Sequence, residues 1–332
     1  MFRHRTLIAT VVLLATVLLL ACGQKQEEGG LSGKGAQKNA MEQWASSLVP
    51  EKDYNSSQWQ ITFHSRSPSD FFDKYCQRLS KLFKSLGANV NFAMIGACDG
   101  TNDPTIRLRF IPNDHWRGVF VEPMSVNHND LIRYLEQKEI YHRSYVIRGA
   151  ATSVCHSPTI MVERPLYEEK NASLPHWLRR QIGAIVPAHR VEKFKKQGKA
   201  VPARSGDWVI ETVRCVTAAD ILMEWGNTTA TPAEAARQAK RRKSGAPQRR
   251  RRPHVLKIDV EGHDYDVLMS FVRDVPTGDL PLLIEFEAKS IGAKFPAAKL
   301  QLEQRGYVVS KFAADGFAML RGDKIFRAGV KT

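Results

Sequence analysis

The chain has 332 residues, of which 43% are apolar and 25% charged, and its formal net charge is +15. This is the composition of a globular protein with room for one large domain or two small ones, and it excludes a chain that is disordered throughout. Nine Lys and Arg residues and no acidic residue lie within 237–252, so the rest of the chain carries a net charge of only about +6.

The first 25 residues have the pattern of a targeting segment. The basic start MFRHR precedes an almost wholly apolar run over 6–21, and the polar sequence CGQKQEEGG follows. Three fates fit this pattern: a retained membrane anchor, a secretory signal cleaved near 21–23, or a lipoprotein signal acylated at Cys22. Each predicts that the rest of the chain lies on the non-cytosolic side of a membrane, in the ER or Golgi lumen of a eukaryote or as a bacterial lipoprotein.

Residues 26–60 are rich in Gly, Gln, Lys and Ser and poor in large apolar residues, which predicts a flexible stem before a folded domain over 61–325. Acceptor sequences for N-linked glycosylation begin at Asn55, Asn171 and Asn227 and fit a glycoprotein. The five cysteines show no metal-binding spacing, so no zinc site is indicated, and the spacing does not tell which cysteines, if any, are bridged.

The domain begins with a predicted amphipathic helix, because apolar residues recur at intervals of three and four from Ser69 to Gly87. The next stretch, 91–104, is a short apolar strand that runs into a loop with the sequence GACDGTNDP. Glycine at Gly96 and Gly100 permits positive φ and the close approach of a ligand, so we expect the loop to present backbone N–H groups to a nucleotide-like cofactor. An ordinary Asp-Gly turn after a strand is the alternative.

Further strands are predicted at 117–121, 145–149, 159–162, 207–216, 255–260 and 282–287, and a helix is predicted over 130–137. The last two strands are almost continuously apolar, which is typical of strands covered on both faces. Strands that alternate with helices predict right-handed crossovers and a parallel sheet. The final segments, 307–312 and 317–320, flank Ala-Asp-Gly and predict a hairpin. The expected fold is therefore α/β, with a doubly wound, mostly parallel sheet that ends in an antiparallel pair.

The basic tract falls within 226–253, which we predict to be a disordered insertion because like charges repel and apolar anchors are missing. A solvated loop is the first expectation, and contact with acidic glycans or lipid headgroups is the second. Nucleic-acid binding comes last, since no aromatic residue interleaves the tract and the targeting segment leads away from nucleic acid.

Acidic residues follow several of the predicted strands, and in a doubly wound sheet ligands bind beyond the carboxyl ends of the strands. These residues are Asp99, Asp103, Glu122, Asp259, Glu261, Glu285 and Glu287. Glu122 follows Gly100 by 22 residues, close to the interval of about 20 at which an acid reaches ribose hydroxyls. Asp259 follows an apolar strand, where an isolated carboxylate is costly to bury, so we expect it to have a ligand, metal or backbone donor as partner.

Four segments of the chain resemble, in the same order, the motifs of the FkbM-type S-adenosylmethionine-dependent methyltransferases, above all of a subgroup whose first motif is approximately IGANDG. These segments are IGACDGTNDP, GVFVEP, LKIDVEGHDYDVL and LLIEFE. The resemblance covers about residues 85–322. It implies a Rossmann-like class I methyltransferase fold and methyl transfer from S-adenosylmethionine, usually to a hydroxyl oxygen of a sugar or polyketide. The donor-binding positions that it implies are Gly96, Ala97, Asp99 and Gly100 beside the methionine and ribose, Glu122 at the ribose, Ala150 near the adenine, and Asp259 facing the reaction centre.

A methyltransferase of this kind must hold an acceptor oxygen in line with the sulfonium and supply a base as the bond forms. We expect Asp259 to be that base, directly or through a divalent cation. His263, whose ordinary pKa lies near neutrality, is the second candidate and Glu261 the third; a solvated histidine at the start of a helix is the alternative for His263. A glycan hydroxyl is the leading acceptor, and 163–206 is the segment predicted to face it.

A competing hypothesis is a non-catalytic, membrane-tethered module of the same fold that binds polyanions through 237–252. Cys98 favours it, because the resembling subgroup commonly has Asn there, whereas the presence of Glu122, Asp259 and Glu261 argues against it. A nicotinamide dehydrogenase would share the loop and the acid, but GACDG lacks the third glycine of GxGxxG.

Overall fold

The computed structural model describes residues 68–85, 87–165, 208–228, 252–260, 262–312 and 314–320. The predicted targeting segment, the stem, most of the basic insertion, most of 163–206 and Glu261 lie outside the described residues, as do Asn55 and Asn171. Within the described part, no helix has the length and apolar character needed to cross a membrane.

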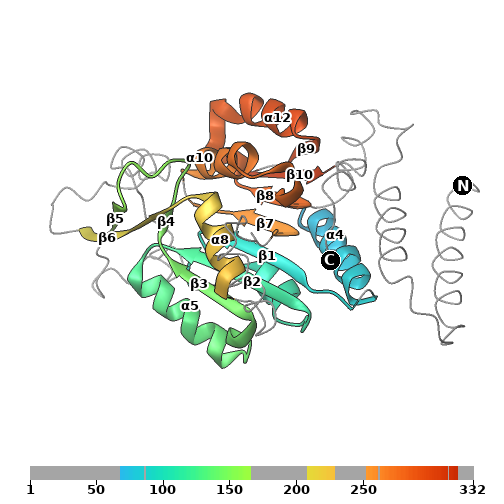
Figure 1. Ribbon diagram of the computed structural model, residues 1–332, viewed down its shortest axis with the longest axis horizontal. Coiled ribbons are helices and arrows are strands. Elements are labelled where there is room, and N and C mark those ends of the chain that lie inside the picture. Colours follow the sequence, from blue (N-terminus) through green and yellow to red (C-terminus); the bar gives the residue numbers. More distant parts are fainter. Residues whose placement is uncertain are drawn as a thin grey trace, which may run out of the picture. The chain divides into compact units, whose positions relative to one another are not determined.

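A seven-stranded sheet forms the centre of the described domain (Figure 1). Its strands lie in the order β3 (Ser144–Arg148), β2 (Trp116–Glu122), β1 (Val90–Ile95), β7 (Val255–Ile258), β8 (Leu283–Phe286), β10 (Asp315–Leu320) and β9 (Tyr307–Phe312). The first five are parallel, and β10 runs antiparallel to both of its neighbours. The predicted fold, a doubly wound and mostly parallel sheet that closes with an antiparallel hairpin, is confirmed.

The chain reverses its direction of travel across the sheet between β1 and β7. It moves outward from β1 through β2 to β3, then returns to the other side of β1 with β7 and β8. In such sheets the reversal is the switch point beyond which ligands bind. All four residues of β7 are buried, as a strand at the centre of a covered sheet requires.

Helices pack against particular strands of this sheet. The pairs in contact are α4 (Pro68–Ser85) with β1, α5 (Ser125–Gln137) with β2 and β3, α8 (Ala218–Thr228) with β3, α10 (Asp264–Met269) with β7, and α12 (Phe295–Gln304) with β9. Shorter helical turns are η1 (Ile106–Phe110), η2 (Tyr141–Arg143), η4 (Ser270–Asp274), η5 (Thr277–Asp279), α11 (Ala288–Ile291) and η6 (Gly292–Lys294). The helix predicted over 130–137 begins earlier, at Ser125. The prediction missed this start because the polar sequence SVNHND shows no apolar periodicity.

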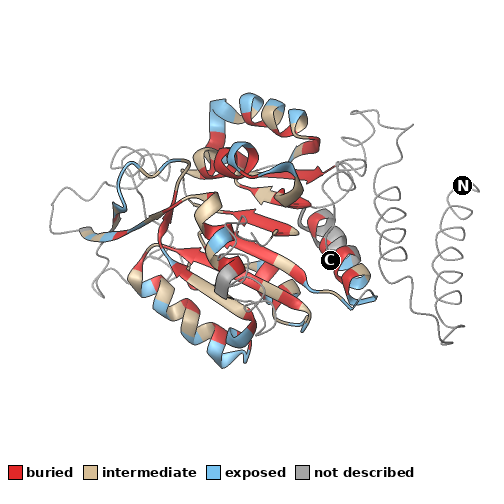
Figure 2. Cartoon of the chain, viewed as in Figure 1, coloured by how far each residue is buried: buried red, intermediate tan, exposed pale blue. Residues whose placement is uncertain are grey.

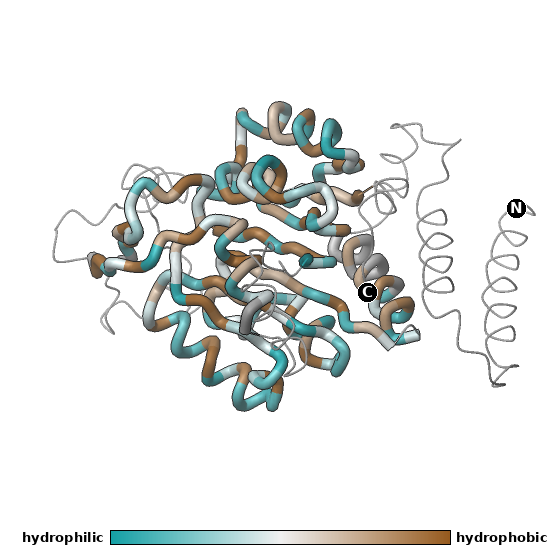
Figure 3. Tube along the Cα trace, in the orientation of Figure 1, coloured by the Kyte–Doolittle hydropathy of each residue, from teal (hydrophilic) through white to brown (hydrophobic). Residues whose placement is uncertain are grey.

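The core lies along the central strands, which Figure 2 shows as almost continuously buried. Figure 3 shows that these strands are rich in hydrophobic residues, whereas α5 and α12 alternate between hydrophilic and hydrophobic positions. Phe92 of β1 contacts the rings of Phe110, Trp116 and Phe120, with ring centroids 5.9 to 6.0 Å apart. This aromatic cluster fastens η1 to β1 and β2.

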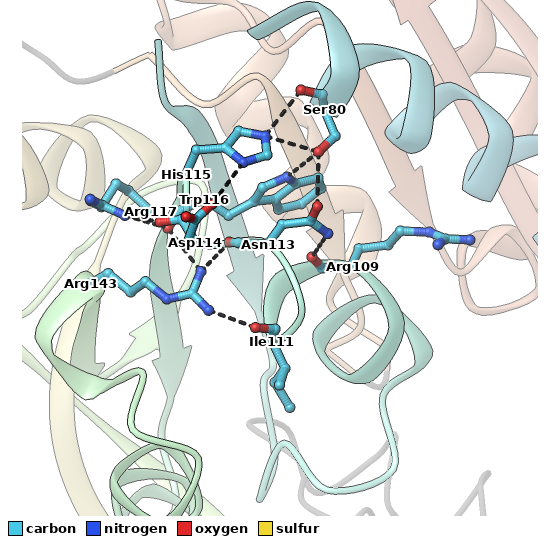
Figure 4. A network of polar contacts seen from close by, with 9 residues as sticks. All are labelled: Ser80, Arg109, Ile111, Asn113, Asp114, His115, Trp116, Arg117 and Arg143. Carbon is cyan, nitrogen blue, oxygen red and sulfur yellow. Dashed lines mark hydrogen bonds and ion pairs between the residues drawn. The ribbon is translucent and has the colours of Figure 1, made fainter. Parts of the chain in front are cut away.

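A polar network closes the edge of the sheet at which β2 begins (Figure 4). The buried indole of Trp116 donates to Ser80 Oγ at 3.1 Å, and Ser80 Oγ in turn lies 2.9 Å from His115 Nε2. The guanidinium of Arg143 donates to the carbonyls of Ile111 (2.8 Å) and Trp116 (3.2 Å). The network satisfies buried polar groups and ties α4 to β2, at the edge opposite to the carboxyl ends of the parallel strands.

A second, three-stranded sheet has the order β4 (Ala150–Ala151), β6 (Trp208–Val216) and β5 (Thr159–Pro165). The sequence placed Ala150 at the end of β3, and this is corrected: the chain leaves β3 at Gly149, and Ala150 pairs with Cys215 of β6. A disulfide joins Cys155 to Cys215, with the two Cα atoms 5.7 Å apart. It closes the small sheet onto the loop that follows β4.

Candidate functional site

The candidate site is built on the loop that leaves β1 at the switch point. Gly96 N and Ala97 N donate to the carbonyl of Val121 in β2, at 2.9 and 3.1 Å. On the other side, Asp259 N donates to the carbonyl of Ile95 at 2.9 Å. The loop therefore starts between two flanking strands whose carboxyl ends lie beside it.

Glycine is required at Gly96 by the chain itself. Its φ is +83°, and an ideal Cβ there would lie 1.9 Å from the carbonyl oxygen of Asp259. Any side chain at this position would collide with backbone, which cannot move without breaking the contact between β1 and β7. Gly100 also has positive φ (+72°), and an ideal Cβ there would lie 2.6 Å from the Leu131 side chain. A side chain at Gly96 would therefore meet fixed backbone, whereas one at Gly100 would have to displace the end of the Leu131 side chain.

Cys98 adopts a left-handed conformation with φ of 51°. Asparagine tolerates this region better than most residues with a side chain. An Asn, which the resemblance leads one to expect at this position, would suit the same backbone conformation as Cys98.

Glu122 lies where it was predicted, at the end of β2, and holds the loop through its carboxylate. Its Oε2 accepts from Cys98 N at 2.9 Å, and its Oε1 accepts from Met124 N at 3.0 Å and from Asn127 Nδ2 at 3.4 Å. Only 4% of Glu122 is exposed. Burial raises its pKa to about 7, against the hydrogen bonds from Met124 and Cys98, and the nearby charge of Asp99 adds to the rise.

The two aspartates of the loop have different roles. Asp99 is buried and accepts from both the N–H (3.0 Å) and the hydroxyl (2.8 Å) of Thr101, so it shapes a local turn. Asp103 accepts from Ile106 N at 2.8 Å through Oδ1, and its Oδ2 lies 2.8 Å from Lys257 Nζ. Asp103 therefore joins the start of η1 to the central strand β7.

Lys257 was not predicted as a functional residue, although a lysine within the apolar run VLKI was a signal for a buried partner. Its ammonium lies between Asp103 and Glu285 Oε1, the latter at 3.2 Å. Burial alone would lower the pKa of Lys257, but the attraction of Glu285 and Asp103 outweighs it and raises that pKa. Burial raises the pKa of Glu285, and the charge of Lys257 opposes this rise.

The turn after β7 is organised by a second residue that sequence reasoning missed. Asp264 is fully buried and accepts from Gly262 N at 3.2 Å and from Val260 N at 3.5 Å. Burial raises its pKa to about 7 against the hydrogen bond from Gly262, and the negative charge of Asp259 contributes. His263 is the N-cap residue of α10, and its Nδ1 lies 3.7 Å from Asp266 Oδ2 in the first turn of that helix.

The structure brings most of the predicted site residues to one edge of the sheet: Gly96, Ala97, Asp99, Gly100, Glu122 and Asp259. Ala150 is buried in a small apolar cluster with Met124, Val162 and Val213, so it adjoins the chain that follows Glu122. The described residues contain no group of three or more His, Cys, Asp or Glu side chains arranged to hold a metal ion. A divalent cation at Asp259 therefore has no support from them.

Residues 230–309 match the family model described as the methyltransferase FkbM domain. The resemblance to FkbM-type methyltransferases is confirmed over these residues, which contain the segments LKIDVEGHDYDVL and LLIEFE. No curated protein matches the chain.

Solved structures with a similar arrangement include several methyltransferases. The methyltransferase FkbM from Methylobacillus flagellatus KT matches with a TM-score of 0.37 and 13% identity, over 70% of this chain and 43% of that one. Fibrillarin from Aeropyrum pernix, solved with natively bound S-adenosyl-L-methionine, matches with 0.31 and 10%, over 70% and 67%. The O-methyltransferase from Bacillus cereus, in complex with SAH, matches with 0.32 and 10%, over 84% and 96%. The chain spans less than half the length of the first of these structures.

Proposed function

We propose that the protein is an S-adenosylmethionine-dependent methyltransferase. The observation that carries this proposal is the junction at the switch point, where the loop after β1 passes the backbone of Asp259 and is held by the buried carboxylate of Glu122. The FkbM domain match over residues 230–309 agrees with it.

The residues present fit this cofactor. A carboxylate oxygen has about two lone-pair sites, so Glu122 Oε2, which accepts from Cys98 N, keeps capacity for a further donor, whereas Oε1 already accepts from Met124 N and Asn127 Nδ2. A ribose hydroxyl is a donor of this kind, and its hydrogen bond would favour the charged form of a carboxyl group whose pKa is about 7. In this proposal Gly96, Ala97, Asp99 and Gly100 bind the methionine and ribose side, and Ala150 adjoins the adenine.

The bound cofactor supplies an electrophilic methyl group, and the protein supplies position and a base. Asp259 is the proposed base, because its N–H is fixed to the Ile95 carbonyl and its side chain is only partly buried at the strand end. Its carboxylate would take the proton of the acceptor hydroxyl as the carbon–oxygen bond forms and the methyl–sulfur bond of the donor breaks, with S-adenosylhomocysteine as the leaving group. His263, whose ring lies beside Asp266 of α10, is the second candidate, and Glu261 the third.

The proposed acceptor is a hydroxyl of a glycan in a non-cytosolic compartment. The disulfide between Cys155 and Cys215 favours such a location, since disulfides persist in oxidising compartments. The apolar N-terminal segment and the glycosylation sequences favour it as well.

Binding and transfer can be tested separately on the full chain. S-adenosylmethionine or S-adenosylhomocysteine at a hundred times its dissociation constant should add about 2.7 kcal/mol to the unfolding free energy, seen as a thermal shift. Incubation with isotopically labelled donor and a panel of secreted glycans should label one fraction. Asp259→Asn should abolish labelling and leave donor binding measurable by calorimetry.

The outcomes separate the hypotheses. No affinity for either ligand at millimolar concentration would overturn the proposed function. Binding without transfer to any acceptor would favour the non-catalytic module instead, and unchanged transfer by Asp259→Asn would remove Asp259 as the base.

A further inference from the structure

We infer that Lys257 is a positioning residue that fixes the far end of the loop after β1. The consequence for donor binding rests on the proposed function, whereas the positioning itself does not. Lys257 stands in β7, where all four residues are buried and an apolar side chain would be the ordinary choice.

The Lys257 ammonium has one partner in the sheet itself, Glu285 of β8, besides its partner in the loop. Lys257 and Glu285 are directly opposite each other in the pairing of β7 with β8, and their charged atoms lie 3.2 Å apart. Only 11% of the Lys257 side chain and 16% of the Glu285 side chain is exposed. Two adjacent strands thus set the position of the cation, and a buried charge of this kind is retained only where its partners are well placed.

Asp103 transmits this position to the loop. One carboxylate oxygen, Oδ2, meets Lys257, and the other, Oδ1, accepts from Ile106 N at the start of η1. A single side chain therefore anchors the segment that ends the loop to a central strand. The near end is held separately, by the Val121 carbonyl and by Glu122.

The two anchors lie on opposite sides of the loop, because β2 and β7 are the two neighbours of β1. Residues 97–105, which include the proposed donor-binding residues Asp99 and Gly100, connect the two anchors. A loop held at one end only would keep the first contact and lose the second, so its backbone N–H groups would no longer be preorganised for a ligand. Lys257 acts on the loop through Asp103.

Asp103→Asn tests the link with little change of shape. The amide oxygen of Asn can accept from Ile106 N or meet Lys257, but it cannot do both, whereas the aspartate does both. Glu285→Gln is the matched control, because it removes one negative charge beside Lys257, as Asp103→Asn does, while the amide oxygen of Gln can still accept from Lys257 Nζ and hold it in place. Lys257→Met is a third variant, which leaves two buried carboxylates without their cation and is expected to unfold more readily.

Two measurements on the full chain read out the effect. Hydrogen exchange of the amides of 97–105 should accelerate about tenfold or more in Asp103→Asn and change by less than about threefold in Glu285→Gln. The dissociation constant for S-adenosylhomocysteine should rise about tenfold or more in Asp103→Asn alone.

Each outcome decides. Exchange that is unchanged in Asp103→Asn, or equally accelerated in both variants, would overturn the role of Lys257. If the unaltered protein binds no S-adenosylhomocysteine, the proposed function fails, and the exchange measurement still decides whether Lys257 positions the loop.

Discussion

The loop after β1 is held by two buried charges of opposite sign, and they are stabilised in different ways. Glu122, on the β2 side, is bound by N–H groups of Cys98, Met124 and Asn127. Lys257, on the β7 side, is balanced by two carboxylates. Burial accordingly raises the pKa of Glu122 to about 7, whereas the attraction of Asp103 and Glu285 raises the pKa of Lys257 and keeps it charged. One side of the loop therefore responds to pH near neutrality, and the other does not.

The largest expected loss of stability comes from a substitution at Gly96, where the loop after β1 begins between β2 and β7. Gly96→Ala should destabilise the protein by at least about 4 kcal/mol or prevent folding, because its Cβ would lie 1.9 Å from the carbonyl oxygen of Asp259 and its φ is +83°. Urea unfolding measures the loss. Gly87→Ala is the control, since φ is +61° there and no atom lies within 4 Å, and it should cost only about 1 kcal/mol. Equal losses would show that conformation alone explains the requirement at Gly96.

The second-largest effect is expected from removing the disulfide, which lies on the β2 side of the loop after β1 and not on the β7 side. The disulfide between Cys155 and Cys215 spans 60 residues and ties down the small sheet, whose apolar cluster includes Met124. Replacing both cysteines by serine should lower the unfolding free energy by about 3 to 4 kcal/mol, through the greater entropy of the unfolded chain.

Hydrogen exchange reports where this loss is felt. The amides near Glu122 and β4 should exchange faster than in the unaltered protein, and those near Lys257 should not. Equal acceleration on both sides would show that the two anchors are not independent.

The pH response is the third test. The folded-state pKa of Glu122 is raised from an ordinary 4.5 to about 7, so the folded protein binds the extra proton between these values. The contribution of Glu122 to stability is therefore largest at the acid end of this window, and it falls by about 3 kcal/mol as pH rises through it. Glu122→Gln should abolish that part of the slope.

Asp264 provides a second titrating carboxyl group, away from the loop after β1, with which the pH response of Glu122 can be compared. Its pKa is also raised to about 7 by burial, so Asp264→Asn should remove a comparable part of the slope without touching the loop after β1. Unfolding free energies measured from pH 4.5 to 8 for both variants check this. A slope that neither variant reduces would contradict the assignment of the titrating groups.

The smallest expected effect lies in the middle of the loop. Cys98→Asn should stabilise the protein by up to about 1 kcal/mol, because Asn tolerates the left-handed backbone at φ 51° better than Cys. Thermal unfolding measures the gain. Cys76→Ala is not a matched change, since Cys76 is buried in α4, so Cys98→Ala serves as the control and should give no gain. Destabilisation by Asn would show that the Cys98 side chain makes a contact worth more than the backbone preference.

The sequence predicted what depends on local pattern. The apolar runs gave the parallel strands, and the glycines with Glu122 located the switch point, because their spacing reflects the path of a single β–loop–β segment. Contacts between residues far apart in the sequence could not be predicted. Nothing local tells that Ala150 pairs with Cys215, that Cys155 is bridged, or that Lys257 meets Asp103 across the sheet.

The bond between Asp259 N and the Ile95 carbonyl joins residues that are far apart along the chain. Contacts of such long range form late, since the intervening chain must be ordered first. During synthesis from the N-terminus, β1 and β2 emerge well before β7, and the loop after β1 has only its Glu122 anchor until Lys257 and Asp259 arrive. A nascent chain halted before residue 255 would therefore carry the glycine loop without a completed donor site, so the proposed activity would be absent until most of the protein had left the ribosome.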